Sequence, residues 1–112
     1  ADAAKEKLTR RTAAMIVPHM FGAPADLDAL CALGVPVIED LAQALGATYK
    51  GSPAGSQWTI AVCSFYATKV ITTGEGGMVL SDSLELLDRV RDAREYDRRD
   101  DAHARFNFFE KL

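Results

Sequence analysis

Three side chains of this 112-residue chain are candidates for binding one ligand together: an amine at Lys69, a carboxylate at Asp40 and a hydroxyl at Ser64. Lys69 lies in Tyr66–Ile71, a stretch with no other charge. A lone lysine is usually a solvated surface cation, but an amine in apolar surroundings is a candidate for nucleophilic or proton-transfer chemistry. Ser64, five residues earlier, is a candidate phosphate ligand, and Asp40 is a candidate partner for a cation.

These side chains are positioned by three apolar runs that are typical of buried strands. The first run, Ala13–His19, ends at His19; the second, Val35–Ile38, is followed by Glu39 and Asp40; the third, Thr59–Phe65, contains Ser64. Ligands of parallel sheets bind outside the carboxyl ends of the strands. The pattern therefore places His19, Asp40 and Ser64 at one edge of a sheet.

Two other interpretations concern the residues around Asp40. An aspartate before Leu41–Leu45 is also typical of a helix N-cap, and Gln43, three residues on, suits a capping pair, so both roles of Asp40 stay open. Glu39 is expected to point to the opposite side as a surface residue.

The segment Gly74–Gly77 predicts a tight turn or a close backbone approach.

The order of elements predicts an α/β fold, a mostly parallel sheet with flanking helices. A helix is expected from Asp26 to Leu33, ended by Gly34. A short helix is expected at Leu41–Leu45. A fourth strand at Met78–Leu80 and a final helix from Asp82 to about Tyr96 complete the series.

Composition excludes several classes of protein. The chain is 48% hydrophobic, which is too high for disorder, and its apolar runs are far too short to span a membrane. A net charge of −3 argues against nucleic-acid binding. The two cysteines make no disulfide framework, and no secretory signal opens the chain, so a reducing, cytoplasmic location is expected. The two histidines lack zinc-ligand spacing, and no metal site is predicted.

Several motifs in the same order resemble the DegT/DnrJ/EryC1/StrS family of sugar aminotransferases, which depend on pyridoxal 5'-phosphate (PLP) and have fold type I. The matching segments are Val17–Gly22, Val37–Ala47, Gly55–Ser56, Ser64–Lys69 and Gly74–Val79. The resemblance covers about residues 12–82 and continues more loosely to Asn107. It implies that the chain is a partial large, PLP-binding domain, without the N-terminal segment and the C-terminal small domain.

The resemblance also implies a role for each matching side chain. Lys69 matches the catalytic lysine that binds PLP as a Schiff base and moves protons, and Asp40 matches the carboxylate that pairs with the pyridine nitrogen. The other cofactor-binding positions are Gln43, near the 3-hydroxyl of the ring, Ser64, a phosphate ligand, and Asn107, which matches the asparagine of an N-x-R segment whose arginine is absent here.

The implied activity is transfer of an amino group from an amino acid donor to a nucleotide-linked keto sugar, in a homodimer. PLP-dependent dehydratases of this family carry histidine at the position of Lys69, so lysine favours transamination. Two alternatives stay open. One is a catalytically silent fragment or scaffold without cofactor, and the other is a PLP enzyme of another outcome, such as a dehydratase or a cyclising enzyme.

Overall fold

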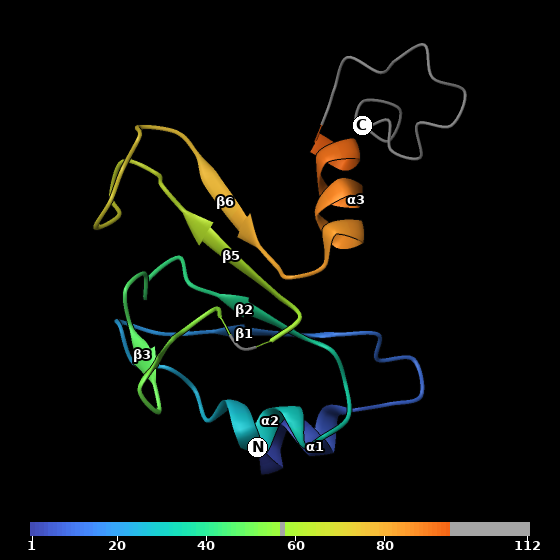
Figure 1. Cartoon of the computed structure of the whole chain (residues 1–112). Coiled ribbons are helices and arrows are strands. Elements are labelled where there is room, and N and C mark those ends of the chain that lie inside the picture. Colours follow the sequence, from blue (N-terminus) through green and yellow to red (C-terminus); the bar gives the residue numbers. More distant parts are fainter. Residues whose placement is uncertain (57, 95–112) are drawn as a thin grey trace. The chain divides into compact units, whose positions relative to one another are not determined.

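The computed structural model describes residues 1–56 and 58–94, which fall into two units, residues 1–82 and the segment that begins at Ser83. The first unit contains eight of the elements in Figure 1. They are α1 (Asp2–Lys7), β1 (Met15–Pro18), α2 (Leu27–Cys31), β2 (Val37–Asp40), β3 (Thr48–Tyr49), β4 (Ser52–Pro53), β5 (Ile60–Ser64) and β6 (Gly77–Leu80).

Four strands form one sheet in the order β1-β2-β5-β6. The pairs β1–β2 and β2–β5 are parallel, and β5–β6 is antiparallel. In register, Pro18 lies opposite Asp40, and Asp40 lies opposite Val62. The predicted fold class, a mostly parallel sheet with helices, is confirmed, and the fourth strand is the antiparallel one.

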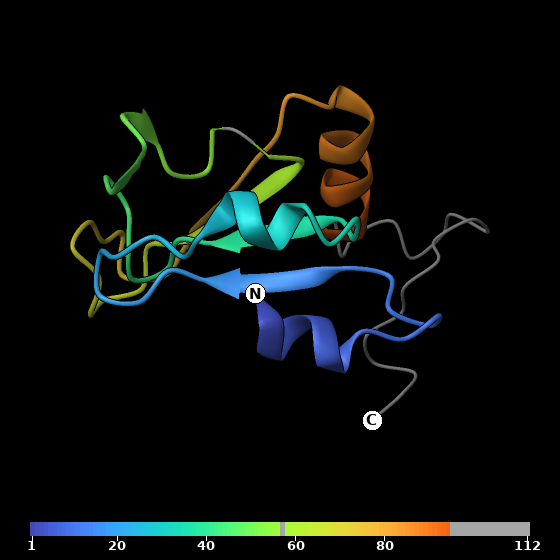
Figure 2. The same cartoon turned by 90° about the horizontal axis from the view of Figure 1, so that it is seen from below.

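One face of this sheet carries the core, because alternate residues of a strand point to the same side. Val17 and Val37 are buried on this face with Leu27 of α2, which lies across β1 and β2 (Figure 2). The side chain of Asp26 accepts a hydrogen bond from the backbone N–H of Ala29 and caps α2. A second buried cluster contains Leu41, Ala61 and Cys63.

The predicted helix at Leu41–Leu45 does not form. The chain there makes successive tight turns, with the N–H of Ala44 bonded to the carbonyl of Leu41 and the N–H of Ala47 bonded to that of Ala44. The carbonyl of Leu41 accepts from Ala44, three residues on, so the bond to the fourth residue that an α-helix requires is not made. Only four residues lie between Leu41 and Gly46, which is too short a segment to nucleate a helix.

Gly55, which follows the β3–β4 hairpin, provides a stability prediction. Its φ is +86°, and a Cβ there would lie 2.5 Å from Leu41 Cδ1 and 3.1 Å from Ala61 Cβ. Gly34 has a similar φ of +76° but open space. Gly34→Ala should cost only the left-handed backbone penalty, about 1–2 kcal/mol. Gly55→Ala should cost a further ~1–3 kcal/mol for overpacking. Urea denaturation checks the order, and equal losses would contradict the crowding at Gly55.

The second unit is described by α3 (Leu84–Arg94). The helix begins after Ser83, whose hydroxyl accepts a hydrogen bond from the N–H of Leu86. The ion pairs Glu85–Arg89 and Asp88–Arg91 lie along its exposed surface. The expected end of this helix near Tyr96 lies outside the described residues. Among the described helices, none is long and apolar enough to cross a membrane.

Candidate active site

The segments that follow β1, β2 and β5 gather at one end of the sheet, where Figure 2 shows all three connections. Asp40 is the last residue of β2 and lies opposite Val62, and Ser64 is two residues further along β5. Two residues along a strand return to the same face. Asp40 and Ser64 therefore lie on the same face of the sheet at its carboxyl edge. The sequence predicted their position at this edge.

Asp40 is half-buried and uses one carboxylate oxygen locally. Oδ1 accepts a hydrogen bond of 2.9 Å from the N–H of Ala42, and the backbone carbonyl of Asp40 accepts one of 3.0 Å from the N–H of His19. Because no helix follows, this bond stabilises a turn rather than capping a helix, and it is compatible with a ligand role. Within residues 1–56 and 58–94, the other carboxylate oxygen has no hydrogen-bond partner, so it is available to a cationic ligand.

Ser64 and Lys69 belong to the connection between β5 and β6. The hydroxyl of Ser64 accepts a hydrogen bond of 3.4 Å from the N–H of Tyr66, and the N–H of Lys69 donates to the carbonyl of Tyr66 at 2.9 Å. This turn places Lys69, which is half-buried, beside the end of β5. In the described part of the chain its amine makes no hydrogen bond or ion pair, so it is free to react.

Gly76, just before β6, and Gly77, its first residue, are required by close packing, which the sequence indicated for the segment Gly74–Gly77. The N–H of Phe65 donates to the carbonyl of Gly76 at 2.8 Å. A Cβ at Gly76, whose φ is +148°, would lie 2.5 Å from Thr73 Oγ1. At Gly77 it would lie 2.9 Å from the carbonyl oxygen of Cys63. The loop that carries Lys69 is therefore held against the end of β5.

Gln43 has an exposed side chain, and its backbone carbonyl accepts a hydrogen bond of 3.0 Å from the N–H of Gly22. This bond joins the turn after β1 to the turn after β2. In the same turn Phe21 has a φ of 53° and a side chain that is 86% exposed. Such a backbone is unusual for a bulky residue and is frequent at functional sites.

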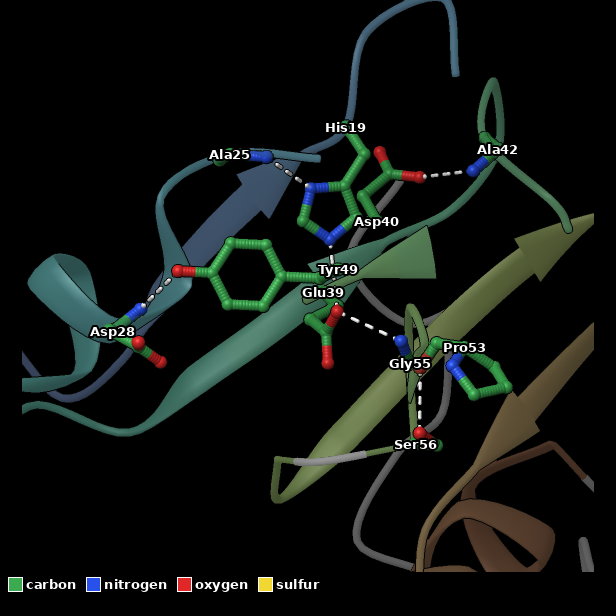
Figure 3. A network of polar contacts seen from close by, with 10 residues as sticks. All are labelled: His19, Ala25, Asp28, Glu39, Asp40, Ala42, Tyr49, Pro53, Gly55 and Ser56. Carbon is green, nitrogen blue, oxygen red and sulfur yellow. Dashed lines mark hydrogen bonds and ion pairs between the residues drawn. The ribbon is translucent and has the colours of Figure 1, made fainter. Parts of the chain in front are cut away.

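Glu39 points to the side opposite Asp40, as expected, but the expected surface position was wrong. Its side chain is fully buried rather than on the surface, and its Oε2 lies 2.9 Å from His19 Nε2 and 2.9 Å from the N–H of Gly55 (Figure 3). The alternation of β2 contained the signal, because Glu39 follows Val37 by two residues and shares its face. His19, which the pattern grouped with Asp40, instead points to this buried side, so its imidazole is not among the groups available to a ligand.

Asn107 lies outside the described residues, and its placement stays a prediction from the sequence. No group of three or more metal-ligating side chains is present among the residues that the structure describes.

The thiol of Cys63 reports on Asp40. Burial, and to a lesser degree the charge of Asp40, raises the pKa of Cys63. Because this pKa is higher in the folded than in the unfolded chain, its contribution to stability is present below the unfolded value and is lost as pH rises through the folded value. Asp40→Asn should therefore lower the pKa of Cys63, and Asp28→Asn should not. Iodoacetamide labelling of the Cys63 peptide between pH 7 and 10, separated from that of Cys31, whose pKa Asp28 raises, measures this, and an equal Cys63 profile in both variants would contradict it.

Comparison with known proteins assigns the chain to a family. The sequence model of the DegT/DnrJ/EryC1/StrS aminotransferase family matches residues 1–109. The chain belongs to this family, whose enzymes are PLP-dependent. The predicted membership is confirmed.

Solved structures agree with this assignment. The aminotransferase TlmJ from Streptoalloteichus hindustanus is 38% identical, with a TM-score of 0.74 over 82% of this chain and 26% of that one. S. venezuelae DesV, in complex with a ketimine intermediate, is 37% identical, with a TM-score of 0.80 over 93% of this chain and 29% of its own. DesI, in the presence of its TDP-sugar product, is 35% identical, with a TM-score of 0.79 over 85% and 25%.

The chain spans less than a third of the length of each of these enzymes. An E. coli GDP-4-keto-6-deoxy-D-mannose-3-dehydratase with bound hydrated PLP has the same fold at 24% identity, a likeness that concerns the fold alone.

Proposed function

We propose that this chain is the central part of the large domain of a PLP-dependent sugar aminotransferase, with Lys69 as the residue that binds the cofactor covalently. The observation that carries the proposal is the unpaired amine of Lys69 in the connection that follows β5, at the edge of the sheet where β2 ends with Asp40, within a chain that belongs to this family. The family membership supports the cofactor, and the free side-chain atoms support the individual roles.

The donor set at this edge fits PLP chemically. The cofactor offers an aldehyde, a phosphate, a phenolic hydroxyl and a pyridine nitrogen. The edge offers an amine at Lys69, a hydroxyl at Ser64, an amide at Gln43 and a carboxylate oxygen of Asp40 that no described residue occupies. Each cofactor group thus has one chemically suitable partner, with Asn107 proposed as a second phosphate ligand.

Each of these residues then has its own role in binding the cofactor or in moving a proton. When bound, PLP supplies a ring that accepts electrons as the substrate carbon loses its hydrogen. The carboxylate of Asp40 holds the proton on the ring nitrogen, which a charge-assisted hydrogen bond favours. Ser64 and Gln43 orient the group. The Nζ atom of Lys69 would take up the proton that the substrate carbon loses and later give it up again, as a general base and then a general acid.

The residue type at position 69 favours transamination over dehydration. A primary amine is able both to bind an aldehyde covalently and to carry a proton, whereas an imidazole in its place is able only to carry a proton. The alternative of a cofactor-free scaffold is disfavoured by membership of a family whose enzymes are PLP-dependent.

We propose an amino acid as the donor, a keto sugar carried on a nucleotide as the acceptor, and a homodimer as the working form. The family name and the TDP-sugar product that accompanies DesI in its solved structure support the acceptor class.

The test is a half-reaction of the full-length protein. Incubation with PLP and L-glutamate should yield one equivalent each of 2-oxoglutarate and pyridoxamine phosphate per site, detected by chromatography. Addition of a nucleotide-linked 4-keto sugar should regenerate PLP and yield an amino sugar. Loss of the sugar hydroxyl without amine transfer would identify a dehydratase and overturn the proposal.

A further inference from the structure

His19 and Glu39 form a buried polar pair directly behind the candidate site. His19 is 1% exposed and Glu39 is fully buried. Figure 3 shows the imidazole between the backbone of Ala25 and the carboxylate of Glu39, with Gly55 on the far side of that carboxylate. The pair therefore joins three segments, the residues after β1, the end of β2, and the residue after β4.

The hydrogen bonds fix the state of the ring. His19 Nδ1 accepts a hydrogen bond of 3.1 Å from the N–H of Ala25, so this nitrogen carries no hydrogen. The hydrogen of the neutral ring is then on Nε2, which donates to Glu39 Oε2 at 2.9 Å. The same oxygen accepts from the N–H of Gly55, also at 2.9 Å. One oxygen of Glu39 thus orients both neighbours.

This arrangement is a poor device for stability alone. Glu39 Oε1 is buried without a hydrogen-bond partner among the described residues, which is costly for a carboxylate. Replacement of a buried polar pair by apolar residues of similar size is often neutral or stabilising. The pair is therefore expected to have a role beyond holding the fold.

The geometry points to that role. Glu39 precedes Asp40, and the backbone N–H of His19 donates to the carbonyl of Asp40 at 3.0 Å. The backbone is thus held at the carbonyl of Asp40 by the N–H of His19. At the preceding residue it is held by the buried side chain of Glu39, which bonds to His19 and Gly55. Asp40 itself is turned by its bond to Ala42.

We propose that His19 and Glu39 are positioning residues that hold the Asp40 carboxylate in place for the cofactor ring. This inference rests on the proposed function. It assigns the pair a positioning role, for which residue 39 needs to accept the two hydrogen bonds but needs no charge. It requires no contact between the pair and the cofactor.

The experiment is a double-mutant cycle on PLP affinity, measured by absorbance titration of the full-length protein and expressed per folded protein. His19→Phe with Glu39→Leu replaces the pair by apolar side chains. This variant should bind PLP about 3- to 10-fold more weakly, and the loss should shrink to less than about twofold in an Asp40→Asn background. Should it not fold, His19→Phe alone, which leaves the Gly55 bond in place, serves the same cycle.

Glu39→Gln is the matched variant, because its amide oxygen accepts both hydrogen bonds without the charge. Its PLP affinity should stay within about twofold of the unchanged chain. An unchanged affinity in the apolar variant, or an equal loss in both Asp40 backgrounds, would overturn the inference, as would a large loss in Glu39→Gln at unchanged stability. Failure of the proposed function is distinct, because Asp40→Asn would then bind PLP like the unchanged chain.

Discussion

Replacement of Lys69 with alanine should abolish covalent PLP binding by this chain and lower the amine-transfer rate of the full-length protein by at least about 10²- to 10⁴-fold. That range is the usual contribution of one general acid–base group, and loss of covalent attachment adds to it. Lys69 is half-buried and its amine has no partner within residues 1–56 and 58–94, so the alanine variant breaks no interaction that holds the fold.

The matched control is Lys50→Ala. The amine of Lys50 is already paired with Asp28 and lies 5.4 Å from the ring centre of Tyr49. This control should leave PLP binding and turnover unchanged. The absorbance of bound PLP and single-turnover rates measure both variants. Normal turnover by Lys69→Ala would place the catalytic amine elsewhere.

Asp40→Asn should weaken PLP binding by roughly 10- to 150-fold, which corresponds to the ~1.5–3 kcal/mol that a hydrogen bond to a charged group contributes. Asparagine keeps an oxygen that accepts from the N–H of Ala42, so the local turn survives while the charge is lost. Equilibrium titration of PLP, with urea denaturation of the same samples, separates affinity from stability.

Glu75→Gln is the control for Asp40, because it removes one negative charge from the exposed loop before β6. It should bind PLP within about twofold of the unchanged chain, as expected for a screened surface charge. If both variants lose affinity equally, the effect is one of net charge, and the specific pairing of Asp40 with the cofactor is wrong.

The sheet could be predicted because its signals are local and repeated. Three apolar runs, each closed by a polar residue, are enough to predict strands whose carboxyl ends meet, and the antiparallel fourth strand is found at Gly77–Leu80. The helix at Leu41–Leu45 was mispredicted. Its composition suits a helix, but the chain makes turns with bonds between residues three apart, and Gly46, with a φ of 87°, ends them.

The site was predictable in part for the same reason. Motif order indicated Lys69, Asp40, Gln43 and Ser64, and the register explains why Asp40 and Ser64 share a face. The burial of Glu39 depends on two partners distant in sequence, His19 and Gly55, that no local pattern joins. Glu39 was assigned to the surface because it is charged, although the alternation of β2 places it on the same buried face as Val37.

The most direct experiment asks whether this chain forms a specific cofactor site. The 112-residue chain is mixed with PLP, reduced with borohydride, digested and mapped by mass spectrometry, with Lys69→Ala in parallel. We expect a label that is confined to Lys69 and absent from the variant. A label spread over Lys5, Lys7, Lys50 and Lys111 at equal levels in both proteins would reflect nonspecific amine chemistry and would contradict the claim that these residues form the site.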